Sequence, residues 1–380
     1  MKIAGIVAEF NPFHNGHKHL LNAVRNAGYT HIIVVMSGDF VQRGEPAICD
    51  KWQRAKAALN NGADLVVELP VSYCLSGAET FAKRSVQILE NLGADTIAFG
   101  CECDDKDLLI RCAKSAAKYS TSNDVKELTN TGIPYPSAIQ KIIEKYEGQD
   151  IASILNGANN ILAVEYIKNL SDNTDFLPIK RLGTLHDDNK THGNIASASK
   201  IRELLKENNY ASDFVPCAYD NFSDFSKLEN SIFLKIRSIS KDELLCYNDM
   251  TDELSDRFVN AIKASTNYSQ FLDNVKTKRY TLARIKRICL CILLGITRTD
   301  TQSNFEYIRV LGMNDNGKEV LSDLSKDCPY VNTSLSSLSK ISDKAKHQAN
   351  LESNSADIFS FITEKPLPAG SDFKSFPIIL

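Results

Sequence analysis

The chain has 380 residues, of which 43% are hydrophobic and 24% are charged, and it contains only 18 Gly and 11 Pro. This composition is typical of a folded globular protein and excludes a disordered chain or a collagen-like repeat. The 44 Lys and Arg residues nearly balance the 47 Asp and Glu residues, which gives a net charge of −3. Any binding of nucleic acid must therefore depend on a local basic patch. At about 100–200 residues per domain, the length predicts two or three domains.

The cysteines and the apolar runs indicate a cytoplasmic protein. The 10 Cys are scattered without a C-x-x-C motif, and the only C-x-C pairs are Cys101/Cys103 and Cys289/Cys291, so free thiols are expected and not a zinc ribbon or a disulfide framework. The longest apolar candidate, Ile288–Ile296, is about half of the 18 residues that a membrane span needs. The amino-terminal apolar run is too short for a signal peptide.

Up to about residue 205, short β-branched runs alternate with amphipathic stretches, which predicts βαβ units around a parallel sheet. The predicted strands are Ile3–Ala8, His31–Met36, Leu65–Leu69, Thr96–Phe99 and Leu177–Leu182. The predicted helices are His17–Arg25, Lys51–Asn60, Ala78–Leu92, Lys106–Tyr119, Ser137–Lys145, Asn160–Asn169 and a last one from Ser197 to Leu205. The fold class is therefore α/β, with a Rossmann-like parallel sheet.

The pattern of apolar residues changes after Tyr210. Helical patterns at Phe222–Ile239, Asp252–Ala264 and Tyr280–Leu294 replace the β-branched runs. We therefore predict an α/β domain over residues 1–210 and a mostly α-helical domain over residues 211–380. The tail Pro366–Leu380 is apolar enough to dock on the body but belongs to no clear class.

The first βα junction carries the residues best suited to chemistry. The buried strand ends at Glu9, a turn containing Pro12 follows, and His14 and His17 flank Gly16 where a helix begins. The amino terminus of a helix offers unpaired N–H groups and the positive end of the helix dipole, so both imidazoles can lie beside a bound phosphate. Gly16 allows the backbone to approach a nucleotide closely.

A second candidate anion site lies far downstream, where Ile195–Arg202 opens another helix. Ser197, Ser199 and Arg202 supply hydroxyl groups and a cation at this helix start. Two anion sites on facing loops indicate a triphosphate.

The H-x-G-H motif followed by S-x-S-x-I-R resembles the H-x-G-H nucleotidyltransferase superfamily. Three longer blocks, Ala8–His17, Met36–Pro46 and Ala63–Pro70, are similar to those of the tRNA(Met) cytidine acetate ligase family. Further matches to that family are Phe99-Gly100, Asn159-Asn160-Ile161-Leu162 and Lys278-Arg279-Tyr280-Thr281. The resemblance covers essentially the whole chain.

The resemblance implies an ATP-dependent ligase of the cytoplasm that adenylates acetate, releases pyrophosphate, and acetylates the wobble cytidine of elongator tRNA(Met) to N4-acetylcytidine. It also implies an ATP site, in which one of two adjacent asparagines, Asn159 or Asn160, contacts the nucleotide. This site would comprise Val7, Ala8, Glu9, Phe10, Asn11, Pro12, Phe13, His14, Asn15, Gly16, His17, Lys18, Gly100, Asn159, Asn160, Arg181, Ser197, Ser199 and Arg202.

This residue set suits adenylation. A carboxylate is already a nucleophile at neutral pH, so its attack on phosphorus needs alignment and charge neutralisation but no general base. We therefore expect His14 and His17 to hydrogen-bond the α-phosphate as pyrophosphate leaves, and Lys18 and Arg202 to hold the β- and γ-phosphates. Mg²⁺ is expected with ATP. Glu9 and Asp39 end neighbouring strands, from which they could reach the adenosine, the metal or the amine.

A cluster of cations is the candidate tRNA-binding surface. Between Asn274 and Thr299 the chain has no acidic residue. On a helix, Arg279, Arg284 and Arg287 fall opposite an apolar face, which predicts a packed helix with a basic outer face. Together with Lys278 they are the predicted contacts to tRNA phosphates, whose binding would be salt-dependent. An ordinary solvated helix face explains the same pattern without RNA.

Two other functions share these motifs. A metabolic nucleotidyltransferase would act on a small phosphorylated substrate, but it has no use for the basic helical half. A non-catalytic RNA-binding protein would retain the fold without turnover, and the intact His14, His17, Ser197 and Arg202 argue against it.

Overall fold

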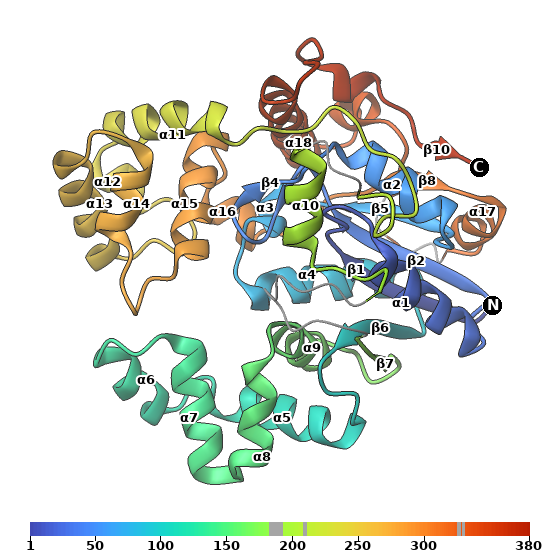
Figure 1. Ribbon diagram of the computed structural model, residues 1–380, viewed down its shortest axis with the longest axis horizontal. Coiled ribbons are helices and arrows are strands. Elements are labelled where there is room, and N and C mark those ends of the chain that lie inside the picture. Colours follow the sequence, from blue (N-terminus) through green and yellow to red (C-terminus); the bar gives the residue numbers. More distant parts are fainter. Residues whose placement is uncertain (182–192, 208–210, 325–327, 329–330) are drawn as a thin grey trace.

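The computed structural model describes residues 1–181, 193–207, 211–324, 328 and 331–380. Its centre is a mostly parallel β-sheet with strand order β10-β8-β5-β2-β1-β6-β7, from which helical lobes project (Figure 1). The strands are β1 (Ile3–Ala8), β2 (His31–Ser37), β5 (Leu65–Leu69), β6 (Thr96–Cys101), β7 (Asp175–Lys180), β8 (Ile308–Met313), β9 (Val331–Asn332) beside β8, and β10 (Ile378–Ile379). The predicted α/β fold with a helical C-terminal region is confirmed.

Both faces of the sheet are buried. Successive side chains of a strand point to opposite faces, so Ile33 of β2 enters one hydrophobic core and Val34 enters another. The helices α1 (Asn15–Asn26) and α2 (Lys51–Asn60) cover the Val34 face. The helices α4 (Ala78–Asn91) and α9 (Ala158–Lys168) cover the Ile33 face. Because both faces are buried, a strand such as Leu65–Leu69 is apolar along nearly its whole length.

Predicted and observed bounds differ by a few residues at most. The strand predicted at Thr96–Phe99 extends to Cys101, and the one predicted at Leu177–Leu182 lies at Asp175–Lys180. Leu182 itself is outside the described residues. The first helix begins at Asn15, because the side chain of His14 caps it.

A helical lobe is inserted between β6 and β7. It consists of α5 (Lys106–Tyr119), α6 (Asn123–Asn130), α7 (Tyr135–Glu147) and α8 (Gln149–Ala152), followed by α9, which packs on the sheet. Figure 1 shows α5 to α8 projecting from one side of the sheet. The chain then re-enters the sheet as β7, beside β6.

A second helical lobe, which we call the helical unit, follows the first half of the chain. Its helices are α11 (Ser226–Ser238), α12 (Lys241–Leu244), α13 (Asp252–Ala264), α14 (Tyr268–Val275), α15 (Leu282–Leu294) and α16 (Arg298–Gln302). It has its own hydrophobic core, which also takes in Phe40 and Val41 from the short hairpin of β3 (Phe40–Val41) and β4 (Glu45–Pro46). Among the described residues no helix is long and apolar enough to cross a bilayer.

After the helical unit the chain returns to the sheet. β8 pairs antiparallel with β5, and β10 pairs parallel with β8. The helices α17 (Asp315–Ser322) and α18 (Asp343–Phe361) lie in the same return. The predicted division into residues 1–210 and 211–380 does not account for this return, in which strands from the second half of the chain complete the sheet of the first half. Residues 208–210, at the predicted boundary, lie outside the described part of the chain.

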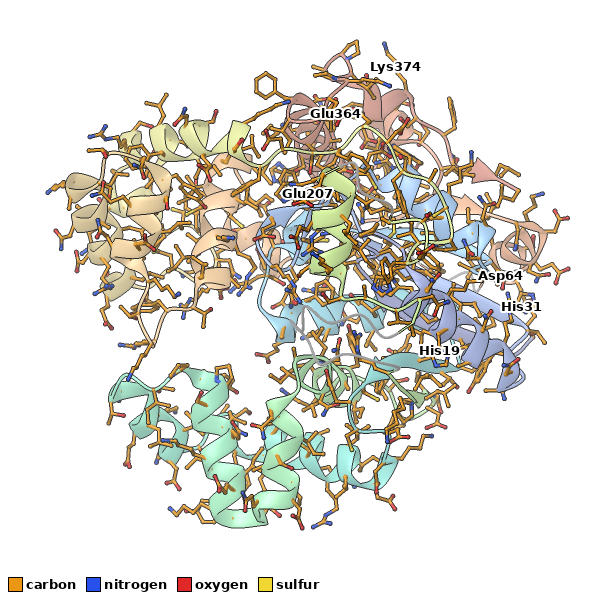
Figure 2. All side chains as sticks on the ribbon, viewed as in Figure 1. His19, His31, Asp64, Glu207, Glu364 and Lys374 are labelled. Atoms are coloured by element: carbon orange, nitrogen blue, oxygen red, sulfur yellow. The ribbon has the colours of Figure 1, made fainter. Side chains whose placement is uncertain are left out.

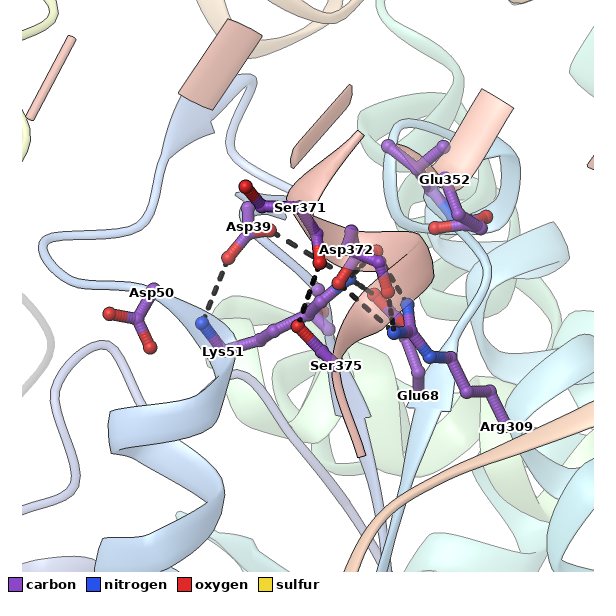
Figure 3. Close-up of polar contacts among 12 residues, drawn as sticks. Asp39, Asp50, Lys51, Glu68, Arg309, Glu352, Ser371, Asp372 and Ser375 are labelled. Carbon is purple, nitrogen blue, oxygen red and sulfur yellow. Dashed lines mark hydrogen bonds and ion pairs between the residues drawn. The ribbon is translucent and has the colours of Figure 1, made fainter. Parts of the chain in front are cut away.

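A buried ion cluster fastens this return to the sheet (Figure 3). The Nζ atom of Lys51 lies 2.8 Å from Oε1 of Glu68 and 2.9 Å from Oδ2 of Asp372. The Nη1 atom of Arg309 lies 2.6 Å from Oδ2 of Asp372 and 3.1 Å from Oε2 of Glu68. All four side chains are at most 3% exposed. The cluster joins α2, β5 and β8 to the segment Ser371–Lys374 near the C-terminus.

Asp64 makes a second attachment at the opposite end of β5. Its Oδ2 accepts the Ile32 N–H at 2.7 Å, and its Oδ1 accepts from the side-chain amide of Asn314 at 2.9 Å. Figure 2 shows Asp64 beside His31, at the side of the sheet where β2 and β5 begin. Asp64 is therefore a structural residue within the block Ala63–Pro70.

Candidate functional site

A buried arginine holds the start of the loop after β1 by hydrogen bonds to backbone carbonyls. Arg54 of α2 is fully buried, and its guanidinium donates to the carbonyl oxygens of Glu9 at 2.7 Å and of Ser37 at 3.0 Å, and also to that of Gly38. These carbonyls lie where β1 and β2 end. Arg54 thus holds the carboxyl ends of two neighbouring strands together. Sequence reasoning missed it, because nothing in a helix-face pattern distinguishes a cation that binds carbonyls from one in solvent.

His14 and His17 form a reciprocal cap at the start of α1. Nδ1 of His14 accepts the Gly16 N–H at 3.1 Å, and Nδ1 of His17 accepts the His14 N–H at 3.2 Å. The two rings stack with their centroids 3.7 Å apart. A Cβ atom on Gly16 would lie 2.9 Å from Cε1 of His14, so the glycine makes room for this ring.

These contacts fix the protonation of both rings. Because each Nδ1 accepts a backbone N–H, the proton of each neutral ring is on Nε2. Burial lowers the pKa of His14 to about 3, with Arg181 and Arg202 adding to the effect. Burial also lowers the pKa of His17 well below its usual value, and the neighbouring His14 lowers it further. At neutral pH the pair therefore offers two uncharged Nε2–H donors, which suits them to hydrogen-bond an anion.

The downstream motif folds onto this loop, as the two-site interpretation requires. Ser197 caps α10 (Ala198–Lys206) by accepting the Lys200 N–H at 3.2 Å. Arg202 donates to the Asn11 carbonyl at 2.9 Å and to the Ser199 hydroxyl at 3.2 Å. The two motifs are thus in direct contact through Arg202.

The segments before and after α10 both pack over the same loop. The Asn15 backbone N–H donates to the Phe214 carbonyl at 2.9 Å, and the Asn15 amide donates to the carbonyls of Asn194 at 2.9 Å and Asp213 at 2.8 Å. The Tyr219 hydroxyl donates to the Phe13 carbonyl at 3.0 Å. These hydrogen bonds hold the loop in place. The Lys18 side chain, on α1, is exposed to solvent.

The two adjacent asparagines have different roles. Oδ1 of Asn160 accepts the N–H groups of Glu102 at 2.9 Å and Cys103 at 3.0 Å, and Asn160 is 4% exposed. Asn159 is half-buried, donates to Glu102 at 2.6 Å and accepts from Arg181 at 3.4 Å. Asn160 therefore shapes the end of β6, and Asn159 lies with Arg181 on the open side.

Gly100 also lies at the end of β6. A Cβ atom there would be 3.5 Å from Cγ of Arg181, so Arg181 lies against this glycine. Glu102, which joins both asparagines, was not singled out in the sequence as a structural residue. The C-x-C spacing around it drew attention only to Cys101 and Cys103.

Glu9 lies half-buried among cations at the end of β1. Its Oε1 accepts the Gln42 N–H at 2.8 Å. Burial raises its pKa, and the Gln42 hydrogen bond and the charges of Arg43, Arg202 and Arg54 oppose that rise. Asp39, by contrast, is turned into the ion cluster, where it accepts the Lys51 N–H at 2.8 Å and is 6% exposed. Asp39 is thus held by the start of α2 and by the ion cluster, and its reach to a substrate stays a prediction.

The four cations predicted to face tRNA do not form one open surface. Arg287 is 14% exposed and donates to the Gln42 carbonyl at 3.1 Å. Arg284 donates to the Asp249 carbonyl, and Arg279 pairs with Glu253. Lys278 is exposed. The apolar face of α15 packs as predicted, but the expectation of a basic outer face is wrong for Arg287, because the hairpin of β3 and β4 covers that part of the helix.

In the described part of the chain, no group of three or more His, Cys, Asp and Glu side chains is arranged to hold a metal ion.

A parallel sheet whose first βα junction presents a capped H-x-G-H loop, in contact with a second helix start, defines the HIGH nucleotidyl transferase class. The family model described as HIGH Nucleotidyl Transferase matches residues 1–372. Among curated relatives, proteins named tRNA(Met) cytidine acetate ligase from Clostridium kluyveri and Acetivibrio thermocellus are each 34% identical. Both comparisons cover 100% of this chain, and 99% and 100% of the respective relatives.

Solved structures agree with this family. The apo crystal structure (form I) of Thermotoga maritima TmcAL superimposes with a TM-score of 0.90 at 28% identity, and the form bound with alpha-thio ATP gives 0.89 at 29%. Both comparisons cover 100% of each chain. The chain belongs to the tRNA(Met) cytidine acetate ligase family of HIGH nucleotidyl transferases.

Proposed function

We propose that this protein is a cytoplasmic ligase that uses ATP to activate acetate and transfers the acetyl group to the wobble cytidine of elongator tRNA(Met). The observation that carries the proposal is the pair of neutral Nε2–H donors on His14 and His17, in a loop that Arg202 joins to the second motif. The family relationship supplies the substrates. The geometry supports the first half of the reaction.

In the first step, a carboxylate oxygen of acetate attacks the α-phosphorus of ATP, and the bond to the bridging oxygen of pyrophosphate breaks. Negative charge grows on the leaving group and the α-phosphate oxygens. The two imidazoles donate to those oxygens without carrying charge themselves, so they need no proton transfer. Arg202 and Lys18 hold the β- and γ-phosphates. The products are acetyl-adenylate and pyrophosphate.

In the second step, the exocyclic amine of cytidine attacks the acetyl carbonyl carbon, the bond to AMP breaks, and the amine loses a proton. AMP leaves as the second product. The wobble base lies in a single-stranded loop, so it can be turned out of its stack to reach the adenylate.

We assign ATP binding to the loop from Val7 to Lys18, to the Gly100 and Arg181 pair, and to Ser197, Ser199 and Arg202. Of the two asparagines, Asn159 is the one that contacts the nucleotide, because Asn160 is committed to backbone N–H groups at the end of β6. Mg²⁺ accompanies ATP as its counterion.

Lys278, Arg279 and Arg284 remain the candidate cations for tRNA phosphates. They lie at the α14–α15 connection and at the start of α15, and Lys278 is the most open of the three to solvent. Contacts of this kind make affinity fall steeply with salt.

The test is acetate-dependent release of pyrophosphate from ATP, with and without tRNA, followed by nucleoside analysis of the tRNA. His17→Asn keeps a side-chain acceptor for the His14 N–H but loses the Nε2 donor, and removing one such donor should lower kcat about 100-fold or more. His19→Ala, two residues along the same helix, is the matched control (Figure 2).

Acetate-dependent release with N4-acetylcytidine in the tRNA would establish the proposal. Release that ignores acetate but requires a phosphorylated metabolite would identify a metabolic nucleotidyltransferase instead. Binding of tRNA without any pyrophosphate release would identify a non-catalytic RNA-binding protein.

A further inference from the structure

The block Met36–Pro46 contains a hairpin that the proposed reaction does not use. This hairpin, β3 and β4, lies between the nucleotide site and the helical unit. Phe40 and Val41 are fully buried and belong to the hydrophobic core of the helical unit. The hairpin thus shares a hydrophobic core with the helical unit, although it follows directly after the end of β2.

Gln42 is the residue through which the hairpin contacts both sides. Its N–H donates to Oε1 of Glu9 at 2.8 Å, and its carbonyl accepts from Nη1 of Arg287 at 3.1 Å. The second guanidinium nitrogen of Arg287 lies 3.7 Å from Oδ2 of Asp249. One peptide segment therefore links a carboxylate beside the H-x-G-H loop to an ion pair inside the helical unit.

The contact between the hairpin and α15 is close and has little freedom to shift. Gly44 has a φ of +77°, and a Cβ atom on it would lie 2.6 Å from the Arg287 backbone nitrogen. On the other side of the turn, Nζ of Lys286 lies 2.5 Å from Oε1 of Glu45. The turn is thus fixed on both sides of the Arg287 contact.

We propose that Arg287 is a positioning residue for the nucleotide site, which holds the hairpin so that the Gln42 N–H keeps the Glu9 carboxylate in place. The proposal rests on the proposed function for its activity readout. The place of Glu9 matters because its charge lies among Arg43, Arg54 and Arg202, and thereby sets the electric field that a triphosphate meets. Arg287 thus acts on ATP through two other residues and not by contact with RNA.

The experiment compares Arg287→Ala, Arg287→Lys and Gly44→Ala with the unmodified protein. Four quantities are measured: the dissociation constant of a fluorescent ATP analogue, the KM for ATP and the kcat of acetate-dependent exchange of pyrophosphate into ATP without tRNA, and the dissociation constant of tRNA(Met). Arg237→Ala, an exposed arginine of the same helical unit, is the matched control. Unfolding midpoints confirm that each variant is folded.

We expect Arg287→Ala to weaken ATP binding and raise the KM for ATP about tenfold, with tRNA affinity within about twofold of the unmodified protein. Arg287→Lys should recover part of the loss, since its ammonium group can still donate to the Gln42 carbonyl. Gly44→Ala should change the ATP constants in the same direction without changing any charge.

A loss of tRNA affinity with unchanged ATP binding in Arg287→Ala would overturn the proposal and return Arg287 to the RNA-binding surface. Unchanged ATP constants in both Arg287→Ala and Gly44→Ala would also overturn it. If the unmodified protein shows no acetate-dependent exchange of pyrophosphate into ATP, the proposed function fails, and the positioning role is then decided by the dissociation constant of the ATP analogue alone.

Discussion

Replacing Asp372 by Asn should destabilise the whole protein, although this residue lies far from the H-x-G-H loop in the sequence. Oδ2 of Asp372 accepts from Lys51 at 2.9 Å and from Arg309 at 2.6 Å, and Oδ1 accepts from Arg309 at 3.0 Å. The Asn amide can replace only one carboxylate oxygen as acceptor. Its NH2 group would then face a cationic donor at the other position.

Two estimates of the cost agree. The cations Lys51 and Arg309 lower the pKa of Asp372 to about 2, against an ordinary value of 3.8, although burial acts in the opposite direction. At 1.36 kcal/mol per pKa unit, a lowering of this size corresponds to stabilisation on the order of 2–3 kcal/mol. Breaking one partner of a buried ion pair costs about 3–5 kcal/mol in other proteins. We therefore expect Asp372→Asn to lose about 3 kcal/mol.

The assay is urea unfolding at pH 7.5, followed by circular dichroism. Because the pKa of Asp372 is lowered on folding, its stabilisation is present above pH 4 and is lost as pH falls through about 2, so the full difference should be seen at pH 7.5. Lys374→Ala, an exposed neighbour in the same segment, is the control and should change stability by less than about 0.5 kcal/mol (Figure 2).

A double-mutant cycle with Lys51→Met should give a coupling energy of about 1–3 kcal/mol, because Lys51 and Asp372 share one network. A loss below about 1 kcal/mol in Asp372→Asn, or additive effects in the cycle, would refute the reasoning. Either result would mean that the C-terminal segment is not fastened through this carboxylate.

Three further outcomes are expected. Asn159→Ala should weaken ATP binding at unchanged stability, whereas Asn160→Ala should lower the unfolding midpoint, since it leaves the N–H groups of Glu102 and Cys103 without their acceptor; equal effects on both properties would contradict the assignment. Burial raises the pKa of Asp39 to about 6, so folding favours the protonated carboxyl group. As the pH rises from 4 to 7, the unmodified protein should therefore lose about 3 kcal/mol of stability that Asp39→Asn does not lose, as measured by urea unfolding. Because the pKa of His14 is lowered to about 3, the NMR signal of its Cε1–H should not titrate between pH 5 and 8, and a titration near pH 6.5 would refute neutral donors.

Strands buried on both faces were predictable, because their apolar runs have a length and β-branched content that helices lack. Leu65–Leu69 was predicted to the residue. The strand Ile308–Met313 was missed, since an isolated run of six residues within a helical region has no neighbouring βαβ pattern to support it. β10 was missed as well, because two residues carry no periodicity.

The candidate site was predictable where its chemistry is local in sequence. The histidine pair and the serines at two helix starts lie within short motifs, and the structure brings those motifs together through Arg202. Roles that depend on distant partners could not be predicted. Arg287 appeared to be an exposed cation because helical periodicity shows which face is polar, but not which other segment covers that face.

The antiparallel strand β8 has a consequence for how the protein is made. Glu68 and Arg309, which meet across β5 and β8, are 241 residues apart in the chain. During synthesis, the edge of β5 therefore stays unpaired until the helical unit has been translated and β8 has emerged. Such non-local pairing is slow to form, and an open apolar edge can pair with other chains. A fragment ending near residue 210 would retain this open edge permanently, so we expect it to aggregate, not to fold as a free nucleotide-binding domain.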